Sequence, residues 1–131
     1  MRHWSLNVFE KIGPNHVRSS WGFEVSVRWN TPQIYVEYLE GDRIVRFDNT
    51  MNAVSLGYPL FTLRPKYITH WAAPFERELL SPEKRKQVIE NLAAALDFMG
   101  ITSDARDERA NVIGNFDSQG WVWKDEKWLN Q

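Results

Sequence analysis

The side chains most often used in catalysis or metal binding are few and scattered in this chain. It has no Cys, and no two of its three histidines, His3, His16 and His70, stand at metal-ligand spacing. No nucleophile-elbow, phosphate-loop or dinucleotide-binding motif occurs. His70, near Glu76, has the residue types for general acid–base work, although packed or surface histidines are more common. We therefore predict no catalytic site, no metal and no cofactor, and keep a small enzyme built around His70 as an alternative.

Three acidic residues close together in the sequence, Asp104, Asp107 and Glu108, are the nearest approach to a cation-binding loop. A loop for a hard cation needs several oxygen ligands at fixed offsets and a turn glycine, a pattern that residues 104–108 lack. Their carboxylates are better suited to a solvated surface.

Two tryptophans near the end of the chain, Trp121 and Trp123, are two residues apart and follow a glycine. Any strand would place both on the same face. Exposed aromatic rings can anchor a protein interface or stack on sugars, whereas buried ones would close the edge of a sheet. An exposed pair would suit a protein-binding surface or a small ligand- or carbohydrate-binding β module.

Length and charge exclude several classes of protein. A chain of 131 residues fits one domain. Its 16 Lys and Arg against 17 Asp and Glu give a net charge of −1, whereas a nucleic-acid binder normally shows a basic excess. The uncharged runs are shorter than the roughly 20 residues that span a bilayer, and no signal-peptide pattern opens the chain. We predict a cytoplasmic protein that binds neither nucleic acid nor membrane.

The first half of the chain has the patterns of β-strands. Apolar side chains occupy every odd position of residues 21–29, which is typical of a half-buried strand. Residues 34–40 and 43–48 flank Gly41-Asp42, a two-residue loop that predicts a tight hairpin. Pairing residue 40 with 43 places Val36 opposite Phe47 and Glu37 opposite Arg46, so apolar residues share one face and opposite charges meet on the other.

Further segments have weaker patterns. We predict a strand over residues 4–8, one or two short strands over 60–63 and 67–71, a turn at 13–15 and irregular structure over 49–59. Residues 102–111 are polar and predict a loop, and residues 111–116 and 121–124 predict two strands joined by a turn at 117–120.

One helix is predicted over residues 82–99. Ser81 suits the N-cap, Pro82 the first helical position, and Gly100 the left-handed position after the last turn. One apolar stripe recurs at helical spacing, and polar residues, including Asn91 and the basic run 84–86, lie mostly elsewhere. The stripe contains Val88, Ile89, Leu92, Ala93, Leu96 and Met99.

These elements predict a single α+β domain over residues 1–131. Its core is an antiparallel β-sheet, mostly a meander of hairpins, packed on one main α-helix. Residues 102–131 are candidates for a peripheral hairpin or tail.

The segment 67–101 resembles small bacterial immunity proteins of polymorphic-toxin and contact-dependent growth inhibition systems. The likeness consists of a short strand-like run ending in Trp71, then Pro74, Ser81 and a Glu/Lys-rich helix. That helix contains Asn-Leu and closes with Ala-Leu-x-Phe-x-Gly around Phe98. The resemblance implies a cytoplasmic protein that binds one cognate toxin and blocks it. Its motif sets the corner before the helix and carries no toxin-binding residue.

A toxin-binding surface is predicted from charge instead. Toxins of these systems are often nucleases, whose clefts are basic because they hold phosphate. An inhibitor gains association rate and specificity from complementary negative charge, and aromatic anchors supply affinity. Residues 101–131 contain six acidic and four basic side chains, so the negative charge lies in the C-terminal third. We therefore expect this third to contribute more to toxin binding than the helix. The predicted partner-binding residues are Asp104, Asp107, Glu108, Asp117, Trp121 and Trp123.

Overall fold

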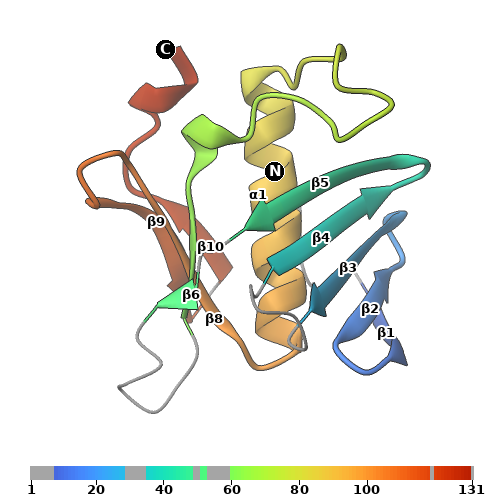
Figure 1. The fold of residues 1–131 in the computed structure, drawn as a ribbon. Coiled ribbons are helices and arrows are strands. Elements are labelled where there is room, and N and C mark those ends of the chain that lie inside the picture. The colour runs from blue at the N-terminus through green and yellow to red at the C-terminus, as the bar shows by residue number, and fades with distance from the viewer. Residues whose placement is uncertain (1–7, 29–34, 49–50, 53–59, 119, 131) are drawn as a thin grey trace.

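Two five-stranded sheets lie on either side of one long helix (Figure 1). The computed structural model describes residues 8–28, 35–48, 51–52, 60–118 and 120–130. The architecture is α+β and contains the predicted antiparallel sheet on one main helix. It also contains a second sheet, which the sequence patterns did not predict.

The first sheet, sheet A, is an antiparallel meander in which each strand pairs with the next along the chain. This arrangement confirms the predicted series of hairpins. Phe23, Val25 and Val27 of the alternating segment are buried, so their face of the sheet contributes to the core. The strands are β1 (Phe9–Gly13), β2 (His16–Ser19), β3 (Phe23–Arg28), β4 (Tyr35–Glu40) and β5 (Arg43–Asp48).

The β4–β5 hairpin has the predicted register. Val36 pairs with Phe47 and Glu37 with Arg46, and Arg46 Nη2 donates to Glu37 Oε2 at 3.1 Å. Gly41 has a φ of +65°, which glycine adopts without the steric cost that other residues incur. The charge pattern and the turn chemistry therefore favour the same pairing.

The helix α1 (Pro82–Phe98) agrees closely with the predicted range. The Ser81 hydroxyl accepts a hydrogen bond from the Lys84 backbone N–H at 3.1 Å, and Gly100 follows the helix at a φ of +81°. Residues 91–96 are all buried, so the middle of the helix is covered on more than the single predicted stripe.

Asn91, expected on the polar side of the helix, is buried. Its Nδ2 donates to Tyr38 Oη at 3.0 Å, and Tyr38 Oη donates to Glu40 Oε1 at 2.6 Å. Glu40 in turn forms an ion pair with Lys84. This chain of polar contacts joins α1 to sheet A and satisfies an amide that the core would otherwise exclude.

The second sheet, sheet B, is mixed. Its strands β7 and β8 are parallel and are connected through α1, whereas the other neighbours are antiparallel. The predicted strands 60–63, 111–116 and 121–124 are confirmed within a residue of their bounds. The strands are β6 (Met51–Asn52), β7 (Leu60–Leu63), β8 (Thr102–Arg106), β9 (Val112–Asp117) and β10 (Gly120–Trp123).

The predicted loop over residues 102–111 is wrong for its first half, because residues 102–106 form β8. The segment lacks an alternating apolar pattern, yet Ser103, Asp104 and Ala105 are buried between β7 and β9. A central strand is held by backbone hydrogen bonds on both edges, and its parallel partner β7 lies far upstream in the sequence. Residues 102–118 and 120–123 thus supply three of the five strands of sheet B.

Of the one or two strands predicted over residues 60–63 and 67–71, only the first forms. A 3-10 helix, η3 (Pro65–Tyr67), ends at the start of the second segment, and an isolated bridge joins His70 to Leu79. Trp71 is buried in the core, so its hydrophobicity serves packing and not a strand. Of the segment 4–8, only Val8 is described, and it is exposed before β1; within 49–59, only β6 is described.

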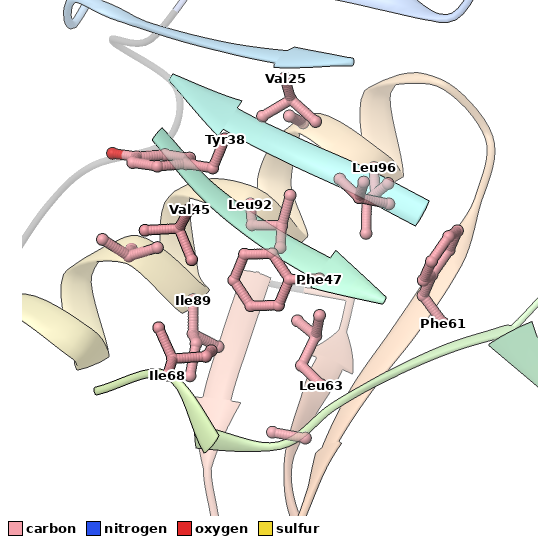
Figure 2. Close-up of a cluster of buried hydrophobic side chains, with 14 of the residues drawn as sticks. Val25, Tyr38, Val45, Phe47, Phe61, Leu63, Ile68, Ile89, Leu92 and Leu96 are labelled. Carbon is pink, nitrogen blue, oxygen red and sulfur yellow. The ribbon is translucent and has the colours of Figure 1, made fainter. Parts of the chain in front are cut away.

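The hydrophobic core lies between the two sheets and around α1. Figure 2 shows Val25, Tyr38, Val45 and Phe47 of sheet A facing Ile89, Leu92 and Leu96 of α1, with Phe61 and Leu63 of β7 and Ile68 completing the cluster. The buried side chains of α1 therefore pack against both sheets.

Leu92→Ala tests this packing. Leu92 is fully buried in the middle of α1, so the substitution should reduce the free energy of unfolding by about 2–5 kcal/mol. Asp97→Ala, at an exposed position of the same helix, is the control and should change it by less than about 0.5 kcal/mol. Urea unfolding measures both, and a loss below about 1 kcal/mol for Leu92→Ala would contradict the packing.

Candidate functional site

A hollow of about 320 Å³ lies at the end of sheet B, beside the C-terminal segment. Three separate parts of the chain surround it: η3, the segment from the end of β8 to the start of β9, and the 3-10 helix η4 (Lys127–Asn130). Figure 1 shows that the β8–β9 turn, η3 and η4 gather at the same end of the molecule. The lining residues are Pro65, Lys66, Arg106, Asp107, Glu108, Arg109, Asn111, Ile113 and Trp128.

Asp107 organises the turn at the mouth of the hollow. Its carboxylate accepts hydrogen bonds from the backbone N–H groups of Arg109 and Asn111, both at 2.9 Å, and from Asn111 Nδ2 at 3.2 Å. Backbone hydrogen bonds from Ala110 N to Asp107 O and from Asp107 N to Asn111 O, both 3.0 Å, close the same turn. The hydrogen bond from the Asn111 backbone is the main cause that lowers the pKa of Asp107 below its ordinary 3.8.

The other predicted acidic residues near this turn are ion-paired. Glu108 Oε1 lies 2.7 Å from Lys66 Nζ, and Asp104 Oδ2 lies 3.1 Å from Arg106 Nη2. Asp104 is buried, and its Oδ1 has no hydrogen-bond partner among the residues that the structure describes. The structure therefore brings Asp107 and Glu108 to the hollow and places Asp104 behind its wall, next to Arg106.

Trp121 and Trp123 belong to an aromatic cluster that packs against α1. Both are half-buried, and Trp123 Nε1 donates to Glu90 Oε2 on the helix at 2.6 Å. The ring centroid of Trp123 lies 5.4 Å from that of Trp121 and 5.3 Å from that of Trp128. Trp128 lines the hollow and packs against Trp123, which in turn packs against Trp121. The two predicted tryptophans therefore support the wall of the hollow from behind and do not form its surface.

Asp117 lies away from the hollow. It is exposed at the far end of β9, in the turn before β10, whereas the hollow contacts the start of that strand. Because a strand rises about 3.3 Å per residue, the length of β9 separates Asp117 from the Asp107 turn.

Sequence reasoning missed Lys66, Arg109 and Trp128. Lys66 and Trp128 come from segments far from residues 104–108 in the sequence, and only the folding of η3 and η4 onto the turn brings them together. Arg109 directly follows the predicted acidic residues, so its position was the available signal. Within the described part of the chain, no hydrogen bond or ion pair of the Arg109 guanidinium is found.

The basic run 84–86 lies outside the predicted apolar stripe of the helix, yet its side chains are half-buried and hold neighbouring segments in place. Arg85 Nη1 donates to Pro65 O at 3.4 Å, and the Arg85 guanidinium lies 5.8 Å from the centre of the Trp128 ring. Lys86 forms an ion pair with Glu126, just before η4. The first turns of α1 thus fix η3 and η4 around the hollow.

His70, the candidate acid–base residue, is exposed outside the hollow, and its Nδ1 is 2.9 Å from Thr69 Oγ1. Among the described residues there is no group of three or more His, Asp or Glu side chains arranged to hold a metal ion. None of the helices in the described part of the chain is both long enough and apolar enough to cross a membrane.

Comparison of the chain with known protein families, with curated protein sequences and with solved structures found no match.

Gly114→Ala should disrupt the aromatic support of the site. A Cβ at Gly114 would lie 2.7 Å from Trp121 Cζ2 and 3.0 Å from Trp123 Cε3, so both rings would have to move. We expect a loss of about 1–3 kcal/mol in the free energy of unfolding and a changed near-UV circular dichroism spectrum. Val112→Ala, at an exposed position of β9, is the control. Unchanged stability and spectrum for Gly114→Ala would contradict the packing of the two tryptophans.

The Asp107 turn should be sensitive to acid. Because the pKa of Asp107 is lowered in the folded protein, its stabilisation is complete above pH 3.8 and is lost as the pH falls through the folded-state pKa. Asp107→Ala should therefore destabilise the protein more at neutral pH than at about pH 3. Urea unfolding at both pH values measures this difference, and an NMR titration of the Asp107 carboxyl carbon should have a midpoint below 3.8. Equal destabilisation at both pH values would contradict the role of the carboxylate.

Proposed function

We propose that this protein is an immunity protein, which binds a cognate protein toxin in the cytoplasm and blocks it. Its binding surface is the turn face, formed by Lys66, Asp107, Glu108, Arg109, Asn111 and Trp128. The resemblance of residues 67–101 supports the class of protein, and the preorganised Asp107 turn is the observation that supports this surface.

Preorganisation is what makes the turn face suited to tight binding. Association normally costs conformational entropy when loops and side chains become ordered at an interface. The Asp107 carboxylate already holds the turn through three N–H donors, and Arg64 Nη1 donates to Asp107 O at 3.1 Å from the neighbouring segment. Little backbone ordering is then left to occur on binding.

The charges of the turn face can re-pair with a partner. Glu108 and Lys66 are both about half exposed, at 54% and 50% of their side-chain surface. An exposed pair of this kind contributes only about 0.2–1 kcal/mol, so exchanging it for contacts with a toxin costs little. A basic nuclease cleft would favour release of Glu108 from Lys66, in keeping with the proposed acidic contribution to binding.

Blocking the toxin requires no reaction by this protein. A rigid surface that covers an active cleft, or the toxin's own partner surface, excludes substrate by volume alone. Trp128, buried in the wall and packed against Trp123, makes this surface rigid from behind.

Charge reversal at the tip of the turn tests the proposal. Glu108→Lys combined with Arg109→Glu leaves the net charge unchanged and alters two exposed side chains that do not hold the turn. The double variant should bind the toxin encoded by the adjacent gene about tenfold more weakly and should protect cells less. Growth of cells that produce this toxin, and titration of the purified pair, provide the measurements.

The matched control is Glu76→Lys combined with Arg77→Glu, two adjacent exposed side chains in the loop before α1 and outside the hollow. It should retain full protection. Full protection by a folded turn variant would exclude the turn face, and no protection by the wild-type chain would exclude the immunity function.

A further inference from the structure

The hollow in the turn face is lined by charged side chains of both signs. Three are cationic, Lys66, Arg106 and Arg109, and two are anionic, Asp107 and Glu108. A third carboxylate, that of the buried Asp104, lies behind the wall and pairs with Arg106, so the charges of this region balance.

Both anionic side chains of the hollow bind groups of this protein. Asp107 accepts three hydrogen bonds from its own turn, and Glu108 pairs with Lys66. Arg106 pairs with the buried Asp104 and also donates to Ala110 O at 3.4 Å. The Arg109 guanidinium makes no hydrogen bond or ion pair with the described residues, although its charge also acts on the Asp107 carboxylate.

Apolar surface completes the wall. Pro65, Ile113 and Trp128 line the hollow together with the charged groups. A volume of about 320 Å³ falls within the range of small-molecule sites, which combine apolar walls with a few polar groups that orient the ligand.

We propose that the hollow binds a monovalent carboxylate that carries an apolar stem. The guanidinium fork of Arg109 pairs with the carboxylate through two parallel N–H donors, and the stem lies against Ile113 and Trp128. One guanidinium without an ion pair matches one negative charge, and the carboxylates of Asp107 and Glu108 in the same hollow disfavour a phosphate dianion. Such a group can be a free organic acid or a glutamate side chain of a bound protein, and both present the same chemistry to the hollow.

The site can be tested with the protein alone, so that its failure is separate from failure of the toxin-binding proposal. Hexanoate is the probe, hexanamide its uncharged equivalent, and inorganic phosphate the competing anion. NMR titration should show saturable shifts of the Trp128 indole N–H and the Arg109 amide with hexanoate, and much smaller ones with hexanamide or phosphate. A blocked Ala-Glu-Ala peptide is the second arm: tighter binding than hexanoate assigns the site to a protein side chain, and weaker binding assigns it to a free acid.

Arg109→Ala should weaken hexanoate binding about fivefold, as expected for one exposed charge-assisted contact. Arg77→Ala removes an exposed arginine from the separate loop before α1 and should leave the affinity unchanged. Arg109→Lys should retain part of the affinity, because the charge remains but the fork is lost. Absence of saturable shifts in the folded protein, equal binding of hexanamide, preference for phosphate, or unchanged affinity of Arg109→Ala would each overturn the proposal.

Discussion

The middle of α1 buries side chains around most of its circumference, because sheet A packs on one side and sheet B on the other. Six consecutive residues, 91–96, are buried, which a helix on the surface of a single sheet would not permit. Three of the six are alanines, whose small side chains let the strands approach closely. The one amide among them, Asn91, is tolerated because Tyr38 accepts its hydrogen bond.

The position of α1 between the two sheets also determines where the candidate site lies. The chain enters α1 after β7 and leaves it into β8, and these two strands lie side by side in parallel. The N-terminal turns of α1 then reach the opposite end of the sheet, where Arg85 holds η3 and Lys86 holds the segment before η4. The hollow therefore depends on contacts from one rigid helix, although its lining comes from several segments.

Local patterns predicted those parts of the fold that local physics decides. Ser81, Pro82 and Gly100 bound the helix, and the pairing of Glu37 with Arg46 determined the hairpin register. Strand β8 escaped prediction because Thr-Ser-Asp-Ala-Arg has no periodic pattern, and its partner β7 is distant in the sequence. The site behaved similarly: residues 104–108 were identified, whereas Lys66 and Trp128 became neighbours only through tertiary structure. Trp121 and Trp123 showed that two aromatic residues on one strand face can face inward as well as outward.

We conclude that α1 joins both sheets into one cooperative unit, which includes the strands β8, β9 and β10 that follow the helix. Native-state hydrogen exchange in low concentrations of denaturant measures the opening free energy of each amide. We expect the amides of Leu92 in α1, Val36 in β4 and Ala105 in β8 to exchange with the same free energy, equal to that of global unfolding. Exchange of Ala105 and its neighbours in β9 through a separate opening of lower free energy would contradict the claim.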